Sequence, residues 1–196
     1  MKKDIYQERY LAHQQRKKEI LTSNYGKKVS KLSKNYKIML GDLFKRRSSQ
    51  RVFNNEELSE KELKEFLSFL ENAPSSCDRK GVSVRIITER DDKALLSGLL
   101  VGGVGWVYRA QAILLLLADK KCYKSPAEKE IMPYLDTGVI IQTCYLTAEV
   151  FNLGCCFVNP NIREKNKEFF RKSFGIEDDL IFCGAVIIGK YDKKNI

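Results

Sequence analysis

The sequence predicts one layered domain in which helices pack on a β-sheet, of either the α/β or the α+β class. Three observations favour this. Short apolar runs of strand length alternate with longer segments of helical periodicity. At 196 residues the chain is long enough to bury a sizeable core. Its hydrophobic content of 43% and charged content of 31% are ordinary for a globular protein.

Helical patterns come first along the chain. Apolar residues recur at helical spacing over residues 36–44, and a second helical pattern follows Ser59. Ser59 and Glu62 have the spacing of a capping box, in which the hydroxyl accepts from a backbone N–H and the carboxylate reaches back to the cap. We expect that helix to end at the Ala73-Pro74 pair, because proline cannot continue a helix.

Strands and helices then alternate to the end of the chain. Apolar runs predict strands at residues 82–88, 113–118, 155–158 and 181–188. Helical segments separate them, at residues 91–100, 128–152 and 163–174. The long segment is apolar on most of its faces, which indicates a core helix, and Gly154 stands just beyond it as a stop signal. Asp136 lies in this helix, where it is expected to pair with a cation of a loop.

Positive charge is concentrated near the N-terminus. Residues 1–51 contain 15 Lys or Arg against 4 Asp or Glu, whereas the rest of the chain contains 20 against 21. We therefore divide the chain into a basic helical extension, residues 1–35, and a folded domain, residues 36–196. Such an arm suits an anionic partner: nucleic acid, anionic lipid, an acidic protein or a phosphorylated ligand.

Several functional classes are not expected. The sequence has neither a signal-peptide pattern nor an apolar run of membrane-spanning length, so we expect a cytoplasmic protein without membrane contact. Six cysteines form no CxxC pair and His13 is the single histidine, which argues against a zinc site and against Ser/His/Asp catalysis. We expect the thiols to be reduced.

The most informative stretch is a basic run between two helical patterns. It combines cations with hydroxyls at Lys45, Arg46, Arg47, Ser48, Ser49 and Arg51. Guanidinium groups beside short hydroxyl donors suit a phosphate or the edge of a polyanionic cofactor. The alternative is a solvated basic turn with no binding function.

The order of four motifs resembles the FMN-dependent nitroreductase family. Arg47-x-Ser49-x-Arg51-x-Phe53 looks like the family's opening Arg-x-Ser-x-Arg/Lys-x-aromatic signature. Three further segments follow in the family's order. Residues 73–76 look like its Ala-Pro-Ser-Ser loop, residues 136–154 like its core helix, and residues 182–189 like its closing strand. The resemblance covers about residues 36–192.

This resemblance implies the fold, the cofactor and the reaction. The fold would be α+β: a three-layer sandwich with a mixed, mainly antiparallel central sheet flanked by helices. The protein would be a homodimer with FMN bound non-covalently at the interface. NADH or NADPH would reduce the flavin, which would then reduce a small organic acceptor in a ping-pong cycle. No side chain is expected to serve as the essential acid or base, because the flavin carries the chemistry.

The resemblance also implies a set of cofactor-binding residues. They are Arg47, Ser48, Ser49, Arg51, Pro74, Ser75, Ser76, Asp78, Lys80, Asn161 and Lys190. Arg47 and Ser49 match positions that hold the FMN phosphate and ribityl chain. Arg51 matches a cation near the flavin pyrimidine edge, where it would stabilise the charge of reduced flavin.

Other positions are matched less closely. Asn161 falls near the family's backbone amides that approach flavin N5, and Lys190 lies where a C-terminal extension would supply cations. Asp78 stands where the family usually has an amide, so its contact with the ring changes unless Arg79 or Lys80 pairs with it.

Two alternatives remain open. Trp106 either lines the flavin pocket or packs in the core. The chain as a whole could instead be a non-enzymatic or degenerate flavin-fold protein whose basic arm binds nucleic acid or an acidic partner. Aromatic residues interleave the cations of the arm, at Tyr6, Tyr10, Tyr25 and Tyr36, and could stack on bases. We favour the flavin enzyme, without a nucleic-acid partner, because aromatics at helical spacing more often serve packing.

Overall fold

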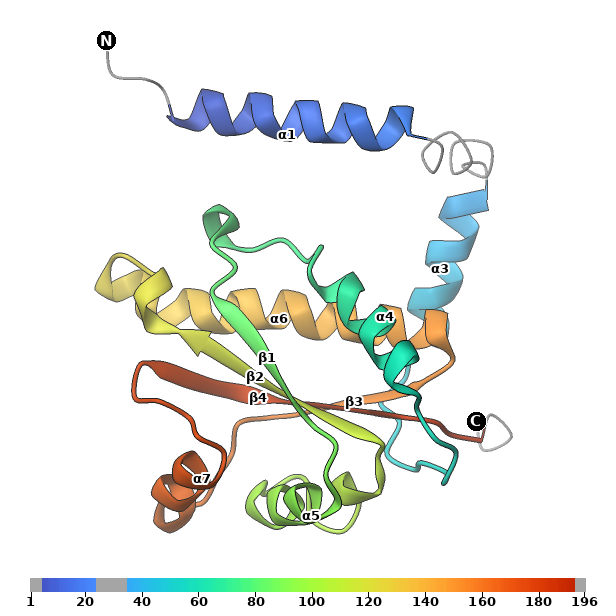
Figure 1. Ribbon diagram of the computed structural model, residues 1–196, viewed down its shortest axis with the longest axis vertical. Helices are drawn as coiled ribbons and strands as arrows, with labels where there is room; N and C mark the ends of the chain where they lie inside the picture. The colour runs from blue at the N-terminus through green and yellow to red at the C-terminus, as the bar shows by residue number, and fades with distance from the viewer. Residues whose placement is uncertain (1–4, 24–34, 193–196) are drawn as a thin grey trace. The chain divides into compact units, whose positions relative to one another are not determined.

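The computed structural model describes residues 5–23 and 35–192 of the chain (Figure 1). The chain divides into two compact units between Lys45 and Arg46. The first contains the helix α1 (Ile5–Thr22) and all but the last residue of α3 (Tyr36–Arg46). The predicted extension, residues 1–35, lies partly outside the described residues, and its boundary stays a prediction. Along the described residues, no helix has the length and apolar character needed to cross a membrane.

The second unit is built on a sheet of four strands. These are β1 (Val82–Ile87), β2 (Ala112–Asp119), β3 (Gly154–Val158) and β4 (Leu180–Gly189). Their order is β1-β2-β4-β3, and each neighbouring pair is antiparallel. An isolated parallel bridge joins Ser49 to Cys155 of β3, while the strands themselves pair antiparallel rather than in the mixed sheet predicted. The four predicted strands are confirmed.

Helices cover both faces of this sheet (Figure 1). α4 (Glu60–Leu70) and α6 (Pro126–Phe151) lie on one face, and α5 (Arg90–Leu99) and α7 (Lys167–Ser173) lie on the other. The central strand β2 is buried on both sides, because Leu114 and Leu116 pack with α4 and α6 while Ile113 and Leu115 pack with α5 and α7. The predicted three-layer α+β sandwich is confirmed.

The predicted capping box opens α4. The Ser59 hydroxyl accepts from the Glu62 backbone N–H at 3.2 Å, and the Glu62 carboxylate accepts from the Ser59 backbone N–H at 3.0 Å. The same carboxylate binds the Lys190 ammonium at 2.5 Å, which ties α4 to the end of β4. The hydrogen bond from Lys190, followed by those from Ser59, lowers the pKa of Glu62 from 4.5 to about 2.

The end of α6 lies within one residue of the prediction, but a different residue caps it. The helix ends at Phe151, and Asn152 takes the left-handed conformation with φ 54° and caps the last turn. Gly154 is not the stop signal; it is the first residue of β3. The sequence pattern was wrong here because asparagine also adopts the left-handed region at low cost, so the helix needs no glycine.

The prediction that α6 is a core helix is correct for one side only. Its inner face buries Cys144, Tyr145 and Ala148 against the sheet. On another face Ile131 is 55% exposed and Leu135 is 56% exposed. Helical position alone does not say which apolar face meets the sheet of the same chain, so the sequence could not separate these two faces.

The cysteines serve as small apolar residues. Cys144, Cys155, Cys156 and Cys183 are buried and free. Burial raises the pKa of each of these four thiols. Cys77 in the loop after α4 is exposed.

Candidate functional site

The basic run lies alongside the edge strand β3. The Gln50 backbone N–H donates to the Cys155 carbonyl at 2.9 Å, next to the parallel bridge between Ser49 and Cys155. This close approach requires a glycine at position 154, because a β-carbon there would lie 2.8 Å from Gln50 Cγ and 3.1 Å from Phe53 Cε1. Gly154 therefore lets the basic run lie flat against the sheet.

Tyr145 of α6 holds two of the predicted residues. The Arg47 guanidinium lies over the Tyr145 ring, 5.4 Å from its centroid. The Ser49 hydroxyl is 3.0 Å from the Tyr145 hydroxyl, and the Phe157 backbone N–H donates to the same hydroxyl at 2.9 Å. The structure thus brings Arg47 and Ser49 together on one aromatic side chain.

Trp106 supports the third predicted residue in the same way. The Arg51 guanidinium lies 6.0 Å from the centroid of the Trp106 ring. Phe53 stacks on the same indole at 6.3 Å, and the indole N–H donates to the Gly102 carbonyl at 2.9 Å. Trp106 is half-buried, so it packs at the margin of the core. Its ring also contacts the Arg51 guanidinium.

Neither of these two arginines forms an ion pair within the part of the chain that the structure describes. Among the described residues, no carboxylate lies within ion-pair distance of Arg47 or Arg51. Ser48 and Ser49 are exposed beside them. The Arg47 guanidinium with its adjacent hydroxyls has the chemistry of a phosphate site, because guanidinium pairs with phosphate oxygens through paired N–H donors.

The loop after α4 forms a second group of predicted residues. Ser76 begins a short 3₁₀ turn in which Cys77 and Asp78 have φ of 49° and 54°, and Lys80 follows with φ 52°. Left-handed conformations cost free energy in residues other than glycine, so other contacts must hold this loop in place.

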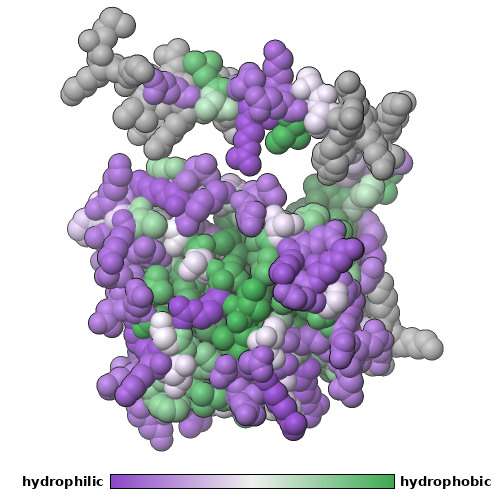
Figure 2. Space-filling model, in the orientation of Figure 1, coloured by the Kyte–Doolittle hydropathy of each residue, from purple (hydrophilic) through white to green (hydrophobic). Residues whose placement is uncertain are grey.

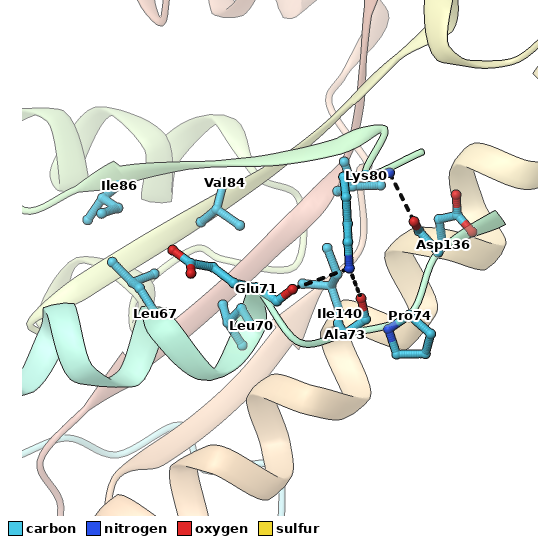
Figure 3. A pocket seen from close by; sticks show the side chains of 12 residues that line it. Leu67, Leu70, Glu71, Ala73, Pro74, Lys80, Val84, Ile86, Asp136 and Ile140 are labelled. Carbon is cyan, nitrogen blue, oxygen red and sulfur yellow. Dashed lines mark hydrogen bonds between the residues drawn. The ribbon is translucent and has the colours of Figure 1, made fainter. Parts of the chain in front are cut away.

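A buried carboxylate supplies one of those contacts. Asp136 of α6 is 4% exposed and accepts from the Ser76 backbone N–H at 2.9 Å (Figure 3). The Tyr123 hydroxyl donates to its other oxygen at 3.1 Å. The hydrogen bonds of Asp136 thus go to a loop amide and a phenol, and its carboxylate interacts with the loop cation Arg79 through charge alone.

The cations of this loop have partners of their own. The Lys80 ammonium donates to the Ala73 carbonyl at 2.8 Å (Figure 3). It also lies 3.3 Å from the Asp78 carboxylate. Arg79 forms an ion pair with Glu128 of α6 at 2.9 Å. Lys80 and Asp78 thus bind each other, and the cofactor contact predicted for each stays a prediction.

The remaining predicted residues lie in separate places. Pro74 is exposed, and the Ser75 hydroxyl accepts from the Lys80 backbone N–H at 2.9 Å. The exposed Asn161 accepts through its backbone carbonyl from Val101 at 3.0 Å. The Lys190 ammonium binds the capping carboxylate of α4, as described above.

The two groups contact the same helix at different points. The basic run reaches α6 at Tyr145 and borders β3, whereas the loop reaches α6 at Asp136 and leads into β1. Nine residues of helix correspond to about 14 Å along its axis. Because β1 and β3 are the opposite edges of the sheet, one chain does not bring the two groups together.

An apolar cavity of about 380 Å³ adjoins the loop, between α4, β1 and α6 (Figure 3). Its apolar walls are Leu67, Leu70, Val82, Val84, Ile86 and Ile140. Figure 2 shows hydrophobic side chains gathered in the middle of this view of the second unit, framed by hydrophilic ones. The cavity places apolar surface beside the loop that is expected to contact the flavin.

Sequence reasoning missed two residues of the site. Tyr145 was one of several apolar residues of a core helix, and its hydroxyl carried the only signal of a polar role. Gly154 was predicted to be a stop signal just beyond that helix, whereas its missing side chain makes room for the basic run beside β3.

Comparison with known proteins shows what this chain is similar to. Residues 99–190 match the model of the Nitroreductase family. No curated protein sequence matches the chain. A nitroreductase family protein from Clostridium difficile 630 is 22% identical, with 78% of this chain and 84% of that chain covered and a TM-score of 0.64.

Two other solved structures are similar. One, from Desulfovibrio desulfuricans, is described as a nitroreductase in complex with FMN; it is 19% identical, over 79% of this chain and 87% of that chain, with a TM-score of 0.67. Another, from Clostridium acetobutylicum, is described as an NADH oxidase. It is 17% identical, with 79% of this chain and 97% of that chain covered and a TM-score of 0.66. The resemblance predicted from the motifs is thus confirmed, and the chain has the fold of the nitroreductase family.

Proposed function

We propose that this protein is an FMN-dependent oxidoreductase that takes reducing equivalents from NADH or NADPH and passes them to a small organic acceptor. The observation that carries the proposal is the group formed by Arg47, Ser49 and Arg51. Its two guanidinium groups lack carboxylate partners among the described residues and are held by aromatic rings beside an exposed hydroxyl. Arg47 with the hydroxyl suits a phosphate ester, and Arg51 suits the electron-rich edge of a reduced flavin.

The residues of the chain bind and orient the cofactor. Arg47 and Ser49 would hold the phosphate, and Arg51 would place a positive charge near the pyrimidine edge. FMN, when bound, would supply reversible hydride acceptance. The apolar cavity beside the loop would keep water away from one side of the site. The solved relatives described as an FMN complex and as an NADH oxidase support this assignment.

We further propose that two copies of the chain complete the site. The loop of residues 74–78 and the Arg47 group lie about 14 Å apart along α6 within one chain. A second copy could bring its own loop to the Arg47 group. The exposed apolar face of α6, with Ile131, Tyr134 and Leu135 each more than half exposed, supports such an interface.

The decisive experiment is the visible spectrum of the purified protein before and after anaerobic addition of NADH or NADPH. We expect a bound flavin spectrum, retained through gel filtration and bleached by the nicotinamide. Light scattering should give the mass of two chains. Arg47→Ala should lose the flavin on gel filtration, because the phosphate loses its bidentate partner.

A matched control is Arg109→Ala. Arg109 also lies over a tyrosine ring, Tyr108, at 5.6 Å, but it is exposed and belongs to a different turn. This variant should keep the flavin. A wild-type protein that stays colourless with excess FMN would overturn the proposal, and salt-sensitive binding to nucleic acid would then favour the alternative assigned to the basic arm.

A further inference from the structure

Tyr145 connects three parts of the site. It projects from α6, is only 9% exposed, and its hydroxyl lies between the basic run and β3. Its ring carries the Arg47 guanidinium. Burial raises the pKa of Tyr145, so the phenol keeps its proton and remains available as a donor.

Two hydrogen bonds hold this hydroxyl in place. The Phe157 backbone N–H can only donate, so at 2.9 Å the Tyr145 oxygen is its acceptor. The same oxygen lies 3.0 Å from the Ser49 hydroxyl, and either hydroxyl can be the donor in that pair. Whichever of them donates, the bond fixes the Ser49 hydroxyl on the side chain that also contacts Arg47.

The ring of Tyr145 also holds the guanidinium of Arg47 in place. Among the described residues no carboxylate pulls Arg47 away, so the attraction of its charge for the Tyr145 ring sets where its N–H groups lie. One side chain therefore contacts both the Ser49 hydroxyl and the Arg47 guanidinium.

We propose that Tyr145 is a positioning residue for the phosphate group of the flavin, acting through Ser49 and Arg47. The inference rests on the proposed function, because it names the residue that prepares the phosphate end of that site. The inference predicts different effects on two ligands. FMN carries the phosphate and riboflavin does not, so Tyr145 should contribute to the binding affinity of FMN and not to that of riboflavin.

The test measures the dissociation constants of FMN and riboflavin by quenching of flavin fluorescence. The variants are Tyr145→Phe, Ser49→Ala and the double variant. Tyr145→Phe keeps the ring and removes the hydroxyl, so FMN affinity should fall about tenfold while riboflavin affinity stays unchanged. The double variant should bind FMN no more weakly than Ser49→Ala alone, because both changes remove the same hydrogen bond.

The control is Tyr108→Phe, which also removes a phenol that is hydrogen-bonded to an arginine, Arg109, at 3.2 Å. It should change neither constant. Equal losses for FMN and riboflavin in Tyr145→Phe would show a general structural role and overturn the inference, as would unchanged FMN binding. A wild-type protein that binds FMN no better than riboflavin would instead overturn the phosphate site itself, and with it the proposed function.

Discussion

The buried carboxylate of Asp136 offers the sharpest test of how the loop of residues 74–80 is held. It accepts two hydrogen bonds, from the Ser76 backbone and from the Tyr123 hydroxyl. Asp136→Asn keeps the size of the side chain but removes its charge. One of its two terminal atoms also becomes a donor, which must face a donor of the loop or of the phenol.

The expected loss follows from these two contacts. A hydrogen bond to a charged group contributes about 1.5–3 kcal/mol, and a buried donor left without an acceptor costs about 1–3 kcal/mol. We take about 3 kcal/mol for Asp136→Asn and about 1.5 kcal/mol for Tyr123→Phe, which interrupts only one contact. In a domain of this size, these values correspond to melting temperatures lower by about 6–12 °C and about 3–6 °C.

Thermal unfolding followed by circular dichroism measures both variants, with Glu130→Gln as the control. Glu130 is an exposed carboxylate of the same helix, so its replacement should leave the melting temperature unchanged. Trypsin provides a second measurement, because Arg79 and Lys80 lie in the loop that Asp136 holds. Cleavage there should be faster in Asp136→Asn. An unchanged melting temperature together with unchanged cleavage would refute the reasoning.

Three further predictions concern stability. Acidification should remove about 1 kcal/mol of stability as the pH falls from about 4.5 to about 2, because Glu62 has a depressed pKa in the folded protein. The loss is small because solvent partly screens this carboxylate. Glu62→Gln should abolish this pH dependence in acid titrations. Asn152→Val should cost about 1–2 kcal/mol in urea unfolding, whereas Asn152→Gly should be nearly neutral, because φ is 54° there. Gly184→Ala should cost more than about 2 kcal/mol, since φ is 122° and the added carbon would lie 2.5 Å from Phe157; Gly98→Ala, with nothing within 4 Å, should not destabilise.

Local sequence signals were enough to predict most of the fold. The capping box of α4 is confirmed because Ser59 and Glu62 act across a single turn, so their spacing determines the contact. The central strand β2 was predictable as an uninterrupted apolar run, because it is buried on both faces. The strand order was not predictable in this way, since it depends on pairings between distant parts of the chain.

The candidate site was predictable only in part, for a physical reason. The motif around Arg47 and Ser49 is local, but its support from Tyr145 spans 96 residues. Lys190 has a side-chain partner 128 residues away in Glu62, and no local pattern reveals such a pair. A cation in a sequence looks the same whether its partner is a ligand or the protein, so only the fold separates them.

The four buried thiols have a practical consequence for anyone who handles this protein. A thiol-reactive dye can reach Cys77 and, more slowly, the half-buried Cys122, whereas the other four cysteines are shielded until the sheet opens. The number of dye molecules taken up per chain would then rise as molecules open, and pulse labelling would count the unfolded population without any introduced probe.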